Sequence, residues 1–147
     1  MIRTLVVGTD FSPASEHALQ YAVDLAAQLG ASVEVVHAFA VPAFNLPIEG
    51  AVISPAEYAV QQSSDAQEQL DQQLAGQAAR GVPLRGHLRA GTAHEELVHF
   101  ADEVAADLIV VGTHARRGAA HLLLGSVAEN VVRASRIPVL TVTPPSP

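Results

Sequence analysis

The amino-acid sequence predicts a single α/β domain, residues 1–147, built on a five-stranded parallel sheet with helices on both faces. Short apolar, β-branched runs alternate along the chain with segments whose apolar residues recur at helical spacing. Two of these runs, at 2–7 and 108–111, are almost continuously apolar, which is typical of strands buried on both faces. With five strands, the common doubly wound order is 3-2-1-4-5. A chain of 147 residues, 49% of them hydrophobic, is long enough to bury such a core.

The local pattern defines the boundaries of each element. The predicted strands are Ile2–Val7, Ser32–Ala38, Pro83–Arg89, Leu108–Val111 and Val139–Val142. The predicted helices are Ala14–Leu29, Pro55–Arg80, Ala93–Val104 and Val127–Ala134. At helical spacing, one face of the first helix is formed by Ala18, Tyr21, Ala22, Leu25, Ala26 and Leu29.

Capping signals support these helices. Ser12 is the expected N-cap of the first helix, Pro13 occupies its first position and Gly30 ends it. Three further segments have the spacing of a capping box, in which a Ser or Thr and a Glu three residues later exchange hydrogen bonds with the backbone. These boxes begin at Ser54, Thr92 and Ser126.

The segment at 40–54 interrupts the alternation of strands and helices. Pro42, Pro47 and Gly50 lie among apolar residues without any periodicity. A long apolar loop of this kind is usually functional or forms a packing flap. The segment is therefore either a lid or partner-binding surface, or a loop folded onto its own core.

Composition excludes several classes of function. A net charge of −7 argues against a general nucleic-acid binder, because phosphate backbones require clustered Lys and Arg. The absence of cysteine excludes disulfides and thiolate chemistry, and the absence of lysine excludes a Walker-type phosphate loop. The histidines are scattered, so no metal site is expected. Without a signal peptide or a membrane-spanning stretch, we expect a soluble cytoplasmic protein.

The most informative stretch is a strand followed by a glycine-bearing loop and a helix start. It reads Gly112-Thr113-His114-Ala115-Arg116-Arg117-Gly118 and resumes, after an apolar run, at Gly125-Ser126-Val127. Backbone N–H groups at a helix N-terminus lack partners and favour an anion. In the predicted strand order, the switch point lies between the first and fourth strands, whose ends are Gly8-Thr9-Asp10 and Gly112-Thr113-His114. The pattern therefore predicts a phosphate site at this point, with Arg116 and Arg117 suited to phosphate.

Each of these signals also has a purely structural interpretation. Gly125 and Ser126 can form a turn and an N-cap that any helix needs. Asp10 can interact with the exposed N–H groups of the first helix, Gly8 can end a strand, and His114 can be a hydrogen-bonding loop residue.

Taken together, the motifs resemble the universal stress protein family. The family's ATP-binding loop has the spacing Gly-x2-Gly-x9-Gly-Ser/Thr, and this chain reads Gly112-x2-Ala115-x9-Gly125-Ser126. The resemblance extends to the segments at 6–12, 35–38, 91–97, 125–131 and 137–140, so it covers nearly the whole chain. It implies a doubly wound fold, homodimers formed through the last strand and, in one branch, bound ATP.

Transferred to this sequence, the resemblance implies an ATP site. The first-strand end would line the adenosine, and Ala38 would pack on the adenine. The fourth-strand end would surround the ribose and α-phosphate, and the helix start at 125–127 would donate N–H groups to the β- and γ-phosphates. Mg²⁺ would neutralise the phosphates while keeping its waters. The implied site residues are Gly8, Thr9, Asp10, Ala38, Val111, Gly112, Thr113, His114, Ala115, Arg116, Gly125, Ser126 and Val127.

We therefore expect an ATP-binding homodimer that serves stress response or signalling, paired through the exposed apolar strand Val139–Val142. The chain departs from the family at Ala115, where the ATP-binding pattern has its second glycine. Two alternatives remain open. One is a dimeric interaction module that binds no nucleotide because Ala115 closes the pocket. The other is a slow ATPase whose base would be His114, Asp10 or Glu129.

Overall fold

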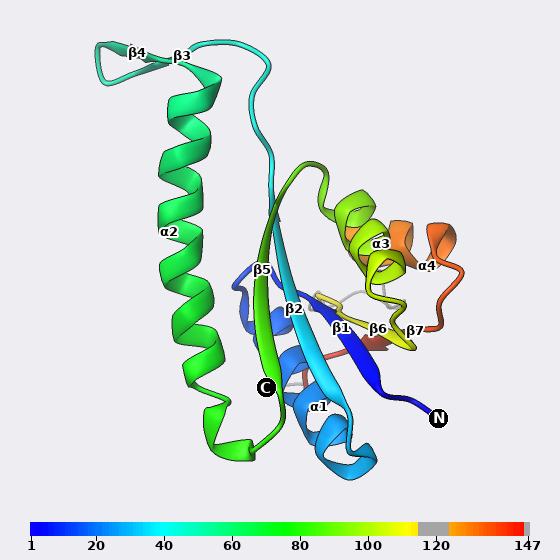
Figure 1. Cartoon of the computed structure of the whole chain (residues 1–147). Coiled ribbons are helices and arrows are strands. Elements are labelled where there is room, and N and C mark those ends of the chain that lie inside the picture. The colour runs from blue at the N-terminus through cyan, green and yellow to red at the C-terminus, as the bar shows by residue number, and fades with distance from the viewer. Residues whose placement is uncertain (115–123, 146–147) are drawn as a thin grey trace.

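A computed structural model describes residues 1–114 and 124–145 of the chain. The main sheet has the order β5-β2-β1-β6-β7, and all its neighbouring strands are parallel. Numbered among the main strands alone, this order is 3-2-1-4-5, which confirms the predicted topology. Figure 1 shows the sheet with α3 and α4 on one side and α1 and α2 on the other.

The main strands lie close to their predicted positions. Their bounds are β1 Thr4–Gly8, β2 Ser32–Phe39, β5 Leu84–Ala90, β6 Leu108–Gly112 and β7 Val139–Val142. The helices are α1 Pro13–Leu29, α2 Pro55–Ala75, α3 Ala93–Glu103 and α4 Ser126–Ala134. Two short strands, β3 Leu46–Ile48 and β4 Ala51–Ile53, and the 3-10 helix η1 Ala78–Arg80 complete the structure.

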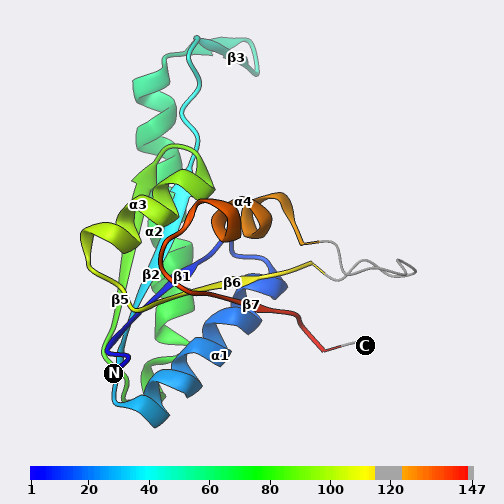
Figure 2. The ribbon, with the colours of Figure 1, turned by 90° about the vertical axis from the view of Figure 1, so that its right-hand side faces the viewer.

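Side chains that alternate along the strands build two separate cores. Leu5 and Val7 of β1 face α1 and α2, where they join a buried cluster that includes Leu19 and Leu70. Val6 faces the opposite side and joins a cluster formed with α3 and α4. Both clusters are almost inaccessible to solvent. Seen from the side in Figure 2, α1 and the α3–α4 pair lie on opposite sides of β1, β6 and β7.

Hydrogen bonds confirm two of the predicted caps. The Ser12 side chain accepts from the Ser15 N–H, and α1 ends at Gly30 with φ of 67°. At Ser54, both halves of the capping box form with Glu57. These contacts fix the start of both helices on this face of the sheet.

Other helix predictions were wrong in detail. The Thr92 side chain makes no cap hydrogen bond, and α4 begins at Ser126 with Gly125 as its N-cap. The second helix ends at Ala75 because the chain turns at 76–77 into η1 instead of continuing to Arg80.

The predicted apolar face of α1 was also wrong at two positions. Tyr21 and Leu29 are 49% and 42% exposed. The buried face is rotated toward Ala14, Leu19 and Val23, because α1 packs against β1, β2, β6 and β7 of the sheet.

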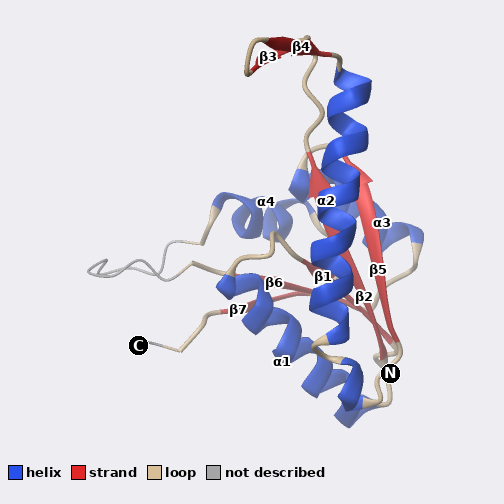
Figure 3. Cartoon of the chain, turned by 90° about the vertical axis from the view of Figure 1, so that its left-hand side faces the viewer, coloured by secondary structure: helices blue, strands red, loops and turns tan. Residues whose placement is uncertain are grey.

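The segment at 40–54 does not fold onto the core. It forms the β3–β4 hairpin, which projects beyond the first turn of α2 at the edge of the molecule in Figure 3. Phe44 on the preceding linker is 79% exposed and Val52 on β4 is 68% exposed. Of the two interpretations, burial against its own core is therefore wrong. Within the described ranges, no helix is both long and apolar enough to cross a membrane.

Candidate functional site

A cavity of about 240 Å³ opens at the carboxyl ends of β1 and β6, where the strand order reverses. Strands β1 and β6 are neighbours, but the helices that follow them cover opposite faces of the sheet, so their loops diverge. The cavity is lined by Gly8, Thr9, Asp10, Ser12, Ser15, Val36, Ala38, Ala93, Leu97, Val111, Gly112, His114, Gly125, Ser126, Val127 and Ala128.

The structure brings most of the predicted site residues together around this cavity. The predicted residues on its wall are Gly8, Thr9, Asp10, Ala38, Val111, Gly112, His114, Gly125, Ser126 and Val127. Thr113 is not part of the wall, because its hydroxyl lies 2.8 Å from the Thr143 hydroxyl beside β7. Ala115 and Arg116 lie outside the described residues, as do Arg117 and Gly118.

Several lining residues were not predicted. Val36 lies two positions before Ala38 on β2, so the alternation of strand side chains would have placed both on one face. Ser12 was expected only as the N-cap of α1, and Ser15 was not singled out at all. Leu97 reaches the cavity from α3, and no local pattern in the sequence indicates that contact.

The three glycines on the cavity wall differ in how much room their surroundings leave for a side chain. A β-carbon on Gly112 would lie 2.6 Å from the Ala14 carbonyl oxygen, so glycine is needed for β6 to approach α1. A β-carbon on Gly8 would lie 2.8 Å from Leu97 Cδ2. Gly125 has φ of −58°, and its nearest described neighbour would be His114 Cδ2 at an ordinary 3.6 Å. Among the described residues, no neighbour of Gly125 excludes a β-carbon, and glycine is a common N-cap.

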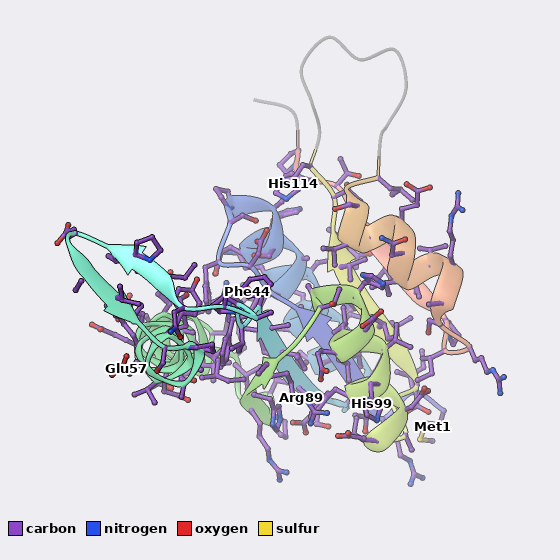
Figure 4. All side chains as sticks on the ribbon, turned by 90° about the horizontal axis from the view of Figure 1, so that it is seen from above. Met1, Phe44, Glu57, Arg89, His99 and His114 are labelled. Carbon is purple, nitrogen blue, oxygen red and sulfur yellow. The ribbon has the colours of Figure 1, made fainter. Side chains whose placement is uncertain are left out.

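One carboxylate and one imidazole face each other at the cavity mouth. The Asp10 Oδ2 and His114 Nε2 atoms lie 3.7 Å apart, and both side chains are more than half exposed. Figure 4 shows His114 at the end of β6, near the start of α1 and of α4. Burial alone would raise the pKa of Asp10. Hydrogen bonds from the Ser12 hydroxyl and N–H and the Ser15 hydroxyl, with His114 nearby, hold it below its ordinary value of 3.8.

The N-terminus of α4 supplies the other half of the site. Gly125 is its N-cap and has no side chain that could accept from the first turn. The backbone of 125–128 lines the cavity, so its N–H groups and the positive end of the helix dipole are available to an anion. In residues 1–114 and 124–145, no three His, Asp or Glu side chains come together as a metal site.

The fold and the cavity define a doubly wound α/β protein with a cavity at the topological switch point, where ligands bind in this class of fold. The model of the universal stress protein family (Usp) matches residues 1–143. The chain is also 32% identical over 146 residues to universal stress protein MJ0531 of Methanocaldococcus jannaschii, a match that covers 99% of this chain and 84% of that protein. The chain therefore belongs to the universal stress protein family.

Two solved relatives carry nucleotides. A universal stress protein in complex with cAMP has a TM-score of 0.70 and 31% identity, and the match covers 97% of both chains. The universal stress protein of Archaeoglobus fulgidus in complex with dAMP has a TM-score of 0.69 and 28% identity, covering 96% of this chain and 98% of that one. Among mycobacterial relatives that are 37% identical over 139 residues, the chain spans 44% of each protein.

The pKa of Asp10 predicts a specific dependence of stability on pH. Because folding lowers this pKa, ionised Asp10 stabilises the fold above pH 3.8, and the contribution is lost as the pH falls below that value through the folded pKa. We expect Asp10→Asn to lower the Tm at neutral pH and the difference from wild type to shrink in acid. Thermal unfolding by circular dichroism from neutral to acidic pH measures this. If the difference in Tm between wild type and Asp10→Asn stays constant across this pH range, the lowered pKa of Asp10 is contradicted.

Proposed function

We propose that this protein binds an adenine nucleotide, with ATP as the preferred ligand, in the cavity at the switch point. The observation that carries the proposal is that an apolar wall, a polar loop and a helix N-terminus converge on one cavity. Relatives that bind cAMP and dAMP support an adenine nucleotide as the ligand class.

The apolar side of the cavity suits a purine base. Val36 and Ala38 from β2 and Leu97 from α3 contribute aliphatic walls, and the small Ala38 side chain leaves room for a flat ring. The Asp10 carboxylate, whose pKa is held below its ordinary value, would accept a hydrogen bond from the ribose or the adenine.

The polar side of the cavity suits the phosphates. Gly125, Ser126 and Val127 would donate N–H groups to the β- and γ-phosphates, and the Ser126 hydroxyl would add a further donor. Mg²⁺ would be held mainly by the phosphates and water, because it needs few protein ligands.

We assign binding, and no rapid turnover, as the function of this site. Among the described residues that line the cavity, Asp10 and His114 are the titratable side chains, and they are directed toward each other. Nucleotide occupancy would then act as a signal in a stress response, reported through the loop that joins β6 to α4.

Calorimetric titration of nucleotide-stripped protein with ATP and Mg²⁺ tests the proposal. We expect a Kd in the micromolar range, on the order of −8 kcal/mol. Gly125→Val should weaken binding at least about tenfold, because its side chain would occupy the approach to the helix N-terminus. Among the described residues, its β-carbon would meet His114 Cδ2 at an ordinary 3.6 Å, so no clash is expected there. Ser126→Ala should weaken binding by a smaller factor through loss of one hydroxyl donor.

Ser54→Ala provides the matched control for this titration. It removes the capping serine of α2, remote from the cavity, and should lower stability without changing ATP affinity. The proposal fails if no adenine nucleotide binds, or if Gly125→Val binds ATP as tightly as wild type. The first result would favour the interaction module in which Ala115 closes the pocket, and the second would mean that ATP does not bind at the start of α4.

We also propose that residues 1–147 act as one domain that forms a homodimer through β7. Strand β7 lies at the edge of the main sheet, so one side of its backbone is not paired within that sheet. An exposed apolar edge strand favours pairing with another strand. A second copy of β7 would extend the sheet across a two-fold axis.

Sedimentation velocity at micromolar concentration tests this dimer. We expect a dimer for the wild type and weaker self-association for Thr141→Glu, because pairing would bring the two introduced carboxylates close together. Gln61→Glu, on the exposed face of α2, adds the same charge away from β7 and should leave the dimer intact. A wild-type monomer at this concentration would rule the dimer out.

A further inference from the structure

The loop that carries Asp10 is held in a backbone conformation that its sequence does not favour. Phe11 has φ of 63°, in the left-handed region. A bulky residue with positive φ is a true outlier, and such outliers persist only where the surroundings enforce them. Phe11 directly follows Asp10 and precedes Ser12, both of which line the nucleotide cavity. The strain therefore lies in the loop that forms one wall of the site.

Thr9 anchors this loop from one side. Its N–H donates to the Val36 carbonyl at 2.9 Å, and its hydroxyl lies 3.1 Å from the Ser15 hydroxyl. The same hydroxyl oxygen accepts from the Phe11 N–H at 3.1 Å. Thr9 is 7% exposed, so these bonds are sheltered from water. They fix the start of the loop but do not reach the Phe11 side chain.

His37, at the end of β2, holds the loop at two points. Its Nδ1 lies 2.8 Å from the Thr9 carbonyl oxygen. A carbonyl oxygen can only accept, so Nδ1 carries the hydrogen and donates. The imidazole also stacks on the Phe11 ring, with centroids 4.3 Å apart and planes tilted by 31°. One side chain thus binds both the backbone before Asp10 and the side chain after it.

We propose that Phe11 and His37 form a clasp that positions Asp10 and Ser12 for nucleotide binding. Neither ring lines the nucleotide cavity, so both act through the loop and not by touching the ligand. Phe11 instead borders a separate hollow beside α2, next to Glu16 and Gln73. With the clasp closed, the Ser12 N–H donates to Asp10 Oδ1 at 2.9 Å and orients the carboxylate.

The clasp has a defined energetic role. A loop that is already ordered binds ligand without the free-energy cost of ordering it. If only a fraction of the molecules hold the loop in the binding conformation, the apparent affinity is reduced in proportion to that fraction. Releasing the Phe11 ring lets its backbone leave the left-handed region. This inference rests on the proposed nucleotide function, but the order of the loop can be measured in the absence of nucleotide and so be tested separately.

Hydrogen exchange and ATP titration together test the clasp. Phe11→Ala keeps the β-carbon that disfavours positive φ and removes the stacked ring. In the absence of nucleotide, we expect the N–H groups of Phe11 and Ser12 to exchange at least about tenfold faster, and ATP affinity to fall about tenfold. Phe11→Tyr keeps the ring and should restore both. The Val110 amide, in the core, reports global stability and separates loop opening from unfolding.

Two substitutions separate the hydrogen bond of His37 from its stacking on Phe11. His37→Asn retains an amide donor near the position of Nδ1 and removes the ring, whereas His37→Phe retains a ring and removes the donor. We expect each to accelerate exchange at Ser12 and to weaken ATP binding by less than Phe11→Ala does. His87→Asn is the matched control, because His87 also stacks on a phenylalanine, Phe100, at 4.5 Å and lies outside the cavity wall. It should leave Ser12 exchange and ATP affinity unchanged.

Unchanged exchange at Phe11 and Ser12 in both Phe11→Ala and His37→Phe would overturn the clasp. Equal acceleration at Val110 would overturn it as well, because the substitution would then act only on global stability. If wild-type protein binds no adenine nucleotide, the proposed function fails, whereas faster exchange confined to 11–12 still supports the clasp.

Discussion

The site depends on the close approach of the end of β6 to the first turn of α1. At Gly112 the two backbones leave no room for a β-carbon, which would lie 2.6 Å from the Ala14 carbonyl oxygen. This contact keeps the carboxyl ends of β1 and β6 close together. The helices that follow these strands, α1 and α4, cover opposite faces of the sheet. The cavity at the switch point is the space that remains. Gly112 therefore permits this packing, whereas Gly125 caps α4 and lines the cavity.

Electrostatics and backbone strain combine in the loop at 9–12. Its hydroxyl and N–H donors lower the pKa of Asp10 and keep the carboxylate ionised. The same loop stores strain at Phe11, balanced by contacts with Thr9 and His37. If these contacts order the loop before nucleotide binds, as we propose, the free energy of binding is not used to fold it.

The sequence was sufficient to predict the strand order, because continuous apolar runs at β1 and β6 and strict alternation of elements leave few topologies. It also predicted the residues that the two strand ends and α4 bring to one cavity. It did not indicate Leu97, whose approach depends on how α3 packs, or the strain at Phe11, which has no sequence pattern. Ser126 was predicted as a cap but begins the helix, because glycine and serine are both common N-caps. The hairpin at 46–53 lacked the periodicity from which strands are predicted.

Backbone amide chemical shifts provide the most direct test of the central claim, that a nucleotide lies between the β1 loop and the start of α4. Titrations with ATP and with adenosine, which lacks phosphates, are compared by NMR. We expect both ligands to shift the amides at 8–10 and 38, and ATP alone to shift those at 125–127. Equal shifts at 125–127 with adenosine, or no shift there with ATP, would contradict a nucleotide in this position.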